Sequence, residues 1–273
     1  MNSPDSLFDY ALAIVCTPDT SEKVRLAKSA ARAWFNHRLS KGHQSSSITM
    51  PDRPGRPAKP ELVPPRQMPK RRLGGNKGKI AMLHALAHIE LNAVDMTWDL
   101  IGRYYHAAAP ASFFDNWVRV GVEEAKHFEL LENRLKELGA HYGDLPAHDG
   151  LWQAAQATGD NLLARIAIVP LVLEARGLDV SPAMIKKLRF LDDDASARIL
   201  EIIYNDEKFH VAVGLKWFRY FCEQQGLVPE PTFQSLVRKH FRGHIKPPFN
   251  DKARSEAGLT PGFYKPLAAI GTT

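Results

Sequence analysis

The chain has 273 residues, of which 44% are apolar and 24% charged, as in a globular protein that can bury a core. It contains no run of eighteen apolar residues, so no membrane span is expected, and its two cysteines exclude a disulfide scaffold and a cysteine-rich metal site. The acidic start MNSPDSLFDY lacks a signal-peptide pattern, which favours a cytoplasmic location.

In chain order, two helices are expected first, at residues 5–16 and 20–39, with Asp19 as the cap of the second; they form an N-terminal helical extension over residues 1–42. A basic, proline-rich strap follows over residues 43–76. The net positive charge is concentrated in this part of the chain, because residues 51–79 carry nine Lys or Arg and two acids, a net of +7 against +6 for the whole chain.

Seven prolines between residues 51 and 79 exclude long helices there. The strap is therefore expected either to pack on the body of the protein as an extended connector or to contact the phosphates of RNA. In the second case Lys70, Arg71 and Arg72 are the candidate nucleic-acid contacts.

The rest of the chain shows helical periodicity, and no useful segment has the two-residue period of a strand. We therefore expect an all-α fold, with a four-helix bundle over residues 77–226 and a C-terminal tail over 227–273 that packs on it. The predicted helices run over residues 77–106, 110–139, 149–176 with a break near Gly159, 181–190, 192–226 and 231–241, and Gly139 and Gly177 are predicted to end two of them.

Two of these helices contain the motif Glu-x-x-His, as Glu124 with His127 and Glu207 with His210. Residues three apart on a helix project from neighbouring lines of one face, so both side chains can reach one metal ion. A single such motif is weak, because exposed charged helices produce it often. Here each glutamate lies on the apolar stripe of its helix, where a carboxylate is costly unless it is paired or metal-bound.

Two further helices carry one glutamate each on an apolar stripe, Glu90 and Glu174. Glu90 precedes Glu124 by 34 residues and Glu174 precedes Glu207 by 33, so two helix hairpins of matched length would bring all four carboxylates to one level. Oxygen and imidazole ligands suit iron or manganese. The resulting set matches the ligands of di-iron or di-manganese bundles, and the predicted metal ligands are Glu90, Glu124, His127, Glu174, Glu207 and His210.

Neighbouring residues suggest supporting roles. Asp206 or Glu123 could accept the free N–H of a ligand histidine on the opposing helix, and Asp206 to His127 is the preferred pairing. Tyr204, one turn before Glu207, is a weak candidate for a redox-active or substrate-facing residue, and a core tyrosine with a bonded hydroxyl is the alternative.

Three residues near the predicted ligands are assigned other roles. His84 and His88 point away from the Glu90 stripe, which favours packing or hydrogen bonding over metal binding. Pro170, one turn before Glu174, is expected to open space beside the metals or simply to bend its helix.

The chain resembles the ferritin-like superfamily of non-haem di-iron carboxylate proteins, and within it a bacterial ferritin-like family of unknown function. The resemblance rests on SLFDYALAIVCTPDTSEKV, GGNKGKIAMLHALAHIEL, the two Glu-x-x-His blocks, VPLVLEARGLD and HIKPPFNDKARSEAGL. A more distant similarity links it to the bacterial tRNA isopentenyl-adenosine hydroxylase. The superfamily includes enzymes and iron stores, so the resemblance implies the fold and the six ligands but not one reaction.

The resulting hypothesis is an oxidoreductase that holds two Fe ions (Mn or mixed Fe/Mn as alternatives) and uses dioxygen as co-substrate to hydroxylate an organic substrate, with RNA or tRNA as one substrate class. Electrons should come from an external reductase, because the chain has no dinucleotide-binding fingerprint. The alternatives are a ferroxidase or other metal-handling protein and a metal-free structural bundle. A monomer or small homo-oligomer with no membrane partner is expected.

Overall fold

A computed structural model of the protein describes residues 5–42, 49–69 and 74–268. Its helices form an all-α bundle fold, and the described residues contain no β-strand, only isolated bridges between single residues. Contacts between Cα atoms divide the chain into two compact units, residues 1–153 and 154–273. The all-α fold expected from the sequence is confirmed.

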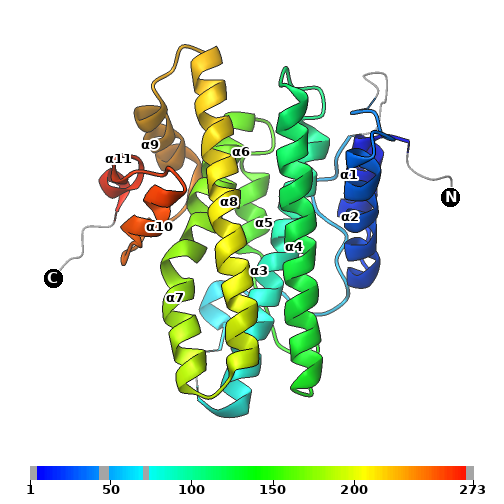
Figure 1. The fold of residues 1–273 in the computed structure, drawn as a ribbon, viewed down its shortest axis with the longest axis vertical. Helices are drawn as coiled ribbons and strands as arrows, with labels where there is room; N and C mark the ends of the chain where they lie inside the picture. The colour runs from blue at the N-terminus through cyan, green and yellow to red at the C-terminus, as the bar shows by residue number, and fades with distance from the viewer. Residues whose placement is uncertain (1–4, 43–48, 70–73, 269–273) are drawn as a thin grey trace. The chain divides into compact units, whose positions relative to one another are not determined.

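The first unit contains two pairs of packed helices (Figure 1). α1 (Leu7–Cys16) packs on α3 (Gly75–Arg103), and α2 (Thr20–Phe35) packs on α4 (Ala111–Glu137). α3 and α4 also lie against each other as a hairpin. Both helices bury large aromatic side chains, among them Trp98, Trp117, Phe113 and Phe128, and this burial stabilises the unit.

The ends of these helices follow local signals. The Asp19 side chain accepts a hydrogen bond from the backbone N–H of Glu22, and Gly139, just after α4, takes a φ of +77°, as both predictions required. α2 ends at Phe35 and not at residue 39, because His37 adopts a left-handed φ of +54°, which cannot continue a right-handed helix.

The strap is described at residues 49–69, where it packs on the first unit and contains one short 3₁₀ helix, η1 (Pro65–Gln67). The Gly55 N–H donates to the Val15 carbonyl at 2.8 Å, and the indole N–H of Trp152 donates to the Asp52 carbonyl at 3.0 Å. A Cβ atom on Gly55 would lie only 2.1 Å from the Cys16 carbonyl oxygen, so this close approach requires glycine.

The second unit contains two long helices, α7 (Ala175–Phe190) and α8 (Asp194–Gln224), which pack against each other (Figure 1). The chain enters α7 through a π-helix, and a tail of short helices follows α8. These other elements are α5 (Gly150–Gln156, which crosses the boundary between the units), α6 (Leu162–Ile168), the π-helix η2 (Val169–Glu174), α9 (Pro229–His240), α10 (Asp251–Glu256), α11 (Pro261–Tyr264) and the 3₁₀ helix η3 (Lys265–Leu267).

The helix predicted over residues 149–176 is broken near Gly159, as expected, and α6 restarts with Asn161 as its cap. Its predicted end at Gly177 is wrong, as is the new helix predicted at 181, because α7 continues through Pro182. Proline cannot donate to the carbonyl four residues earlier, which here belongs to Leu178. The Asn250 side chain donates to that carbonyl at 3.1 Å, so a residue of the tail replaces the missing bond.

α8 begins after Asp193, whose side chain accepts from the Ser196 N–H, and ends before Gly226, which has a φ of +64°. The tail contains the helix expected over residues 231–241, and also α10 and α11, which the sequence reading missed because both are short. Within the described ranges, no helix is both long and apolar enough to span a bilayer.

Candidate metal centre

Three side chains of the first unit gather where α3 and α4 pack together. The His127 Nδ1 atom lies 3.3 Å from an oxygen of Glu90 and 3.4 Å from an oxygen of Glu124. One potential ligand atom of each residue lies within 4.8 Å of the others. Glu90 is 4% exposed and the other two residues are 0% exposed. We call these three residues the first triad.

A second triad, Glu174, Glu207 and His210, lies in the second unit. The His210 Nδ1 atom lies 3.7 Å from an oxygen of Glu207, and one ligand atom of each residue lies within 4.8 Å of the others. Exposure is 9% for Glu174, 6% for Glu207 and 0% for His210. Each unit therefore repeats the same arrangement, a Glu-x-x-His motif on one helix and a glutamate from a neighbouring element.

The apolar stripes predicted from the sequence explain why these polar groups point inward. On α4, Glu124 shares its face with the buried Trp117, Val120 and Phe128. Burial of the apolar neighbours carries the carboxylate into the interior with them, because their positions on the helix are fixed relative to it.

The π-helix η2 ends at Glu174 and has Pro170 in its first turn. The Pro170 carbonyl accepts a hydrogen bond from the N–H of Ala175, five residues later, which is the bond of a wide π turn. A Cβ atom on Gly214 of α8 would lie 2.6 Å from the Pro170 Cβ, so glycine permits this close packing. The helix distortion expected at Pro170 is thus a π-helix that packs on α8.

Each triad offers two carboxylates and one imidazole, and no thiolate. Hard oxygen and nitrogen ligands of this kind bind Fe or Mn. Two carboxylates held this close at low solvent exposure repel each other, and a divalent cation between them would offset both the repulsion and the loss of hydration. The donor set and its burial are therefore compatible with metal binding in each unit.

The two acids expected to support the histidines lie beside the motifs. Glu123 is partly buried and accepts a hydrogen bond from Arg119 at 3.0 Å on its own helix. Asp206 is partly buried on α8. The preferred pairing of Asp206 with His127 stays a prediction.

The Tyr204 hydroxyl lies 3.2 Å from the Asn250 side-chain nitrogen, from which it accepts a hydrogen bond. Tyr204 is thus a partly buried tyrosine with a bonded hydroxyl, the alternative favoured by the sequence.

Hydrogen bonding occupies the other two histidines of α3, as expected. His88 contacts the Tyr142 hydroxyl at 2.8 Å and the His148 carbonyl at 3.1 Å, and the His84 Nε2 atom accepts from the Gly143 N–H at 2.9 Å. Burial, reinforced by the positive charge of Arg56, lowers the pKa of His88 to about 4.

Sequence reasoning missed a second polar cluster on α3. The fully buried Asp95 pairs with the buried ammonium of Lys23 from α2 and, at 3.2 Å, with Arg56 of the strap, which also donates to Asn92 at 2.7 Å. Burial raises the pKa of Asp95 against the pull of both cations, and it lowers the pKa of Lys23. The sequence did contain a signal for this cluster: polar residues recur at the helical spacing of three or four along α3, at positions 84, 88, 92, 95 and 99.

Two arginines in the described part of the strap contact the protein itself: Arg53 pairs with Asp149, and Arg56 pairs with Asp95. The proposed RNA contacts Lys70, Arg71 and Arg72 lie outside the described residues.

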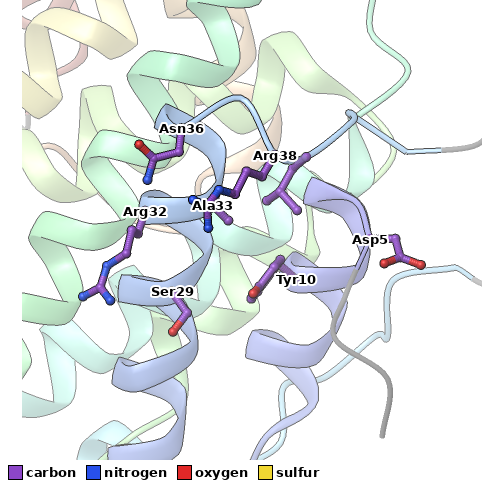
Figure 2. A pocket seen from close by; sticks show the side chains of 8 residues that line it. Asp5, Tyr10, Ser29, Arg32, Ala33, Asn36 and Arg38 are labelled. Atoms are coloured by element: carbon purple, nitrogen blue, oxygen red, sulfur yellow. The ribbon is translucent and has the colours of Figure 1, made fainter.

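A cavity of about 380 Å³ lies beside α1 and α2, and none of its lining residues belongs to the first triad. Figure 2 shows it with Tyr10 from α1 and Ser29 and Arg32 from α2 around it. Arg38, which follows α2, also lines it.

A protein family described as a protein of unknown function, DUF455, matches residues 16–265. A protein of Haemophilus influenzae, described as uncharacterized, is 41% identical over 209 residues, which cover 75% of this chain and 73% of the relative. No solved structure matches the chain significantly. With a family match over most of its length and a relative this similar, the chain belongs to the DUF455 family.

Proposed function

We propose that the two triads together hold two metal ions and that the protein is a non-haem oxidoreductase that uses dioxygen to hydroxylate an organic substrate. The observation that carries the proposal is the duplicated triad, in which each unit buries two carboxylates and one imidazole within ligand distance of one another. Iron is the proposed native metal, with manganese or a mixed pair as alternatives.

Bound iron would supply the oxygen chemistry that amino-acid side chains lack, and an external reductase would supply the two electrons that each hydroxylation consumes. The protein's own part is electrostatic and geometric. Four carboxylates from the two triads balance the charge of two divalent ions. In both triads the Nδ1 atom of the histidine faces the carboxylates, which makes it the nitrogen available to a metal.

Use of Nδ1 as the ligand atom leaves the proton of each imidazole on Nε2. A carboxylate that accepts this proton in a hydrogen bond fixes the tautomer and raises the basicity of the ligand. We propose Asp206 for His127 in this role. Replacement of Asp206 by Asn should lower metal affinity about 10–100-fold, the usual cost of losing such a partner.

The direct test is metal content after anaerobic purification with Fe(II). Two metal ions per chain are expected, and a Glu124→Gln or Glu174→Gln variant should bind fewer. Glu137→Gln on α4 is the matched control, because Glu137 is exposed and pairs with Arg134 on its own helix. Metal-free protein after exposure to Fe(II) and to Mn(II), or equal loss in the control, would contradict the metal site.

The proposed reaction with dioxygen is tested separately from metal binding. Reduced, iron-loaded protein should consume dioxygen with a chemical reductant, and Glu124→Gln should abolish this. Failure to consume dioxygen while two ions remain bound would leave the metal site standing and overturn the oxidoreductase assignment. Fe(II) oxidation that stores iron in a large cage, detected by light scattering, would favour the metal-handling alternative.

RNA as the substrate class is tested through the strap. Charge removal at Lys70, Arg71 and Arg72 should weaken RNA binding and reduce its dependence on salt, because each lost phosphate contact lowers the number of counterions released. Unchanged RNA affinity and salt dependence would exclude these residues as the contacts.

A further inference from the structure

A cavity of about 670 Å³ opens in the second unit, lined by residues of α7, α8 and α10 and by Asn250 just before α10. Its size lies within the range of small-molecule sites, about 300–1,000 Å³. Four basic side chains line it: Lys186 and Arg189 from α7, Lys208 from α8 and Lys252 from α10. The cavity contains none of the triad residues.

Only part of this positive charge is neutralised within the protein. Arg189 pairs with Glu201 at 2.6 Å, and Lys208 pairs with Glu256 at 3.0 Å. Among the described residues, no carboxylate lies within ion-pair distance of the Lys186 or Lys252 ammonium group, although Lys252 is near enough to Glu256 to help lower the pKa of that carboxyl. The lining therefore carries a net charge of +2 from side chains that converge from three helices.

The wall of the cavity is held in place by hydrogen bonds. Asn250 accepts from the Ala253 N–H, and its amide donates to the Leu178 carbonyl and to the Tyr204 hydroxyl. Its backbone N–H donates to Asp179, which also pairs with the buried Arg254 in a bidentate contact at 2.7 and 2.8 Å. Because α10 is fixed to α7 in this way, the backbone segments that carry Lys186 and Lys252 are already held in place, and only their side chains need to be ordered on binding.

We propose that this cavity binds a small organic phosphate, with Lys186 and Lys252 as the principal contacts to its phosphoryl oxygens. A phosphate group near pH 7 carries about −1.5 to −2 charges, which matches the net +2 of the lining. Lysine binds phosphate as a point charge and donates up to three hydrogen bonds. The site is independent of the metal proposal, since its residues lie outside both triads.

The test is calorimetric titration of metal-free, full-length protein with inorganic pyrophosphate in buffer without phosphate or sulfate. A dissociation constant below about 1 mM is expected. Replacement of both Lys186 and Lys252 by Ala should weaken binding at least about tenfold, as loss of charged hydrogen bonds predicts. Glu256→Gln should instead tighten binding, because it releases Lys208 from its ion pair.

Two controls locate the site. Lys187 lies next to Lys186 on α7 but packs over the Phe190 ring and does not line the cavity, so Lys187→Ala should leave affinity unchanged. Arg32→Ala and Arg38→Ala alter the cavity of Figure 2 and should also leave it unchanged. Circular dichroism checks that each variant is folded, which is expected because Lys186 and Lys252 are exposed.

Several results would overturn the proposal: no measurable heat with pyrophosphate, equal affinity in the double lysine variant, or loss of binding in the Arg32 or Arg38 variants. Binding of single-stranded RNA through Lys186 and Lys252 without binding of pyrophosphate would also overturn it. In that case the patch would be a surface for nucleic acid and not a small-molecule site.

Discussion

Helix α3 buries acidic side chains in two different settings. Asp95 is 0% exposed and lies between Lys23 and Arg56, so cations of the protein surround it. Glu90, five residues earlier, is 4% exposed and lies near a second carboxylate, Glu124, and an imidazole. The same helix therefore carries a buried acid paired with cations and a buried acid beside a like charge.

This difference shows why burial alone does not identify a metal ligand. A buried acid that faces a lysine and an arginine has its charge balanced by the fold and ties the strap and α2 to α3. A buried acid grouped with another acid and a histidine has the composition of a ligand set. The two settings should respond differently when a carboxylate is neutralised and when metal is removed.

The largest effect is expected for Asp95→Asn. The change leaves the buried ammonium of Lys23 without its counter-charge, so the free energy of unfolding should fall by about 3–5 kcal/mol. Urea denaturation with EDTA present measures this in metal-free protein. Asp149→Asn is the control, because Asp149 pairs with the exposed Arg53 and its loss should cost at most about 1 kcal/mol. Equal losses in the two variants would refute the distinction.

A lower pH should destabilise the folded protein through His88, which belongs to the same polar period of α3 as Asp95. The pKa of His88 falls from 6.5 to about 4 in the folded protein, so the unfolded chain takes up a proton that the folded chain does not. Stability should therefore decrease as the pH is lowered from 6.5 towards 4, by an amount on the order of 3 kcal/mol. His88→Gln should flatten the pH dependence of urea unfolding in EDTA, and an unchanged slope would exclude His88 as its source.

The triads and the Asp95 cluster also differ in how well the sequence predicts them. The glutamates and histidines of the triads were predictable, because helical periodicity alone places Glu90 and Glu124 on apolar faces. The polar spacing along α3 could have indicated Asp95 itself, but not its pairing, since its partner Lys23 lies 72 residues away and nothing local indicates that contact.

The bounds of α7 could not be predicted from the sequence for the same reason, because they depend on a contact between residues far apart in the chain. Locally, Gly177 and Pro182 predict the end of one helix and the start of another. The helix continues because Asn250, 72 residues after Leu178, hydrogen-bonds the carbonyl that Pro182 leaves open. Local patterns report periodicity and caps, whereas such contacts are set only when the chain has folded.

A smaller effect is expected for Arg56→Gln in the strap. The substitution removes one of the two cations beside Asp95 and the hydrogen bond to Asn92, but leaves Lys23 in place. The free energy of unfolding should fall by about 1.5–2 kcal/mol, the cost of a hydrogen bond to a charged group. Arg66→Gln, at an exposed position of the same strap, should stay within about 0.5 kcal/mol. If both variants behave alike in urea, the strap is not anchored through Asp95.

The smallest change in the free energy of unfolding is expected for Glu124→Gln in metal-free protein. The amide keeps the volume of the side chain and removes repulsion between two carboxylates, so the free energy of unfolding should change by less than about 1 kcal/mol, or rise. Addition of Mn(II) should raise the melting temperature of the unsubstituted protein more than that of the variant, which lacks a ligand of the first triad, because binding to the folded state alone stabilises it. A loss in EDTA as large as that of Asp95→Asn would mean that Glu124 is held by charges of the protein itself, which would remove the physical basis for a cation at the first triad.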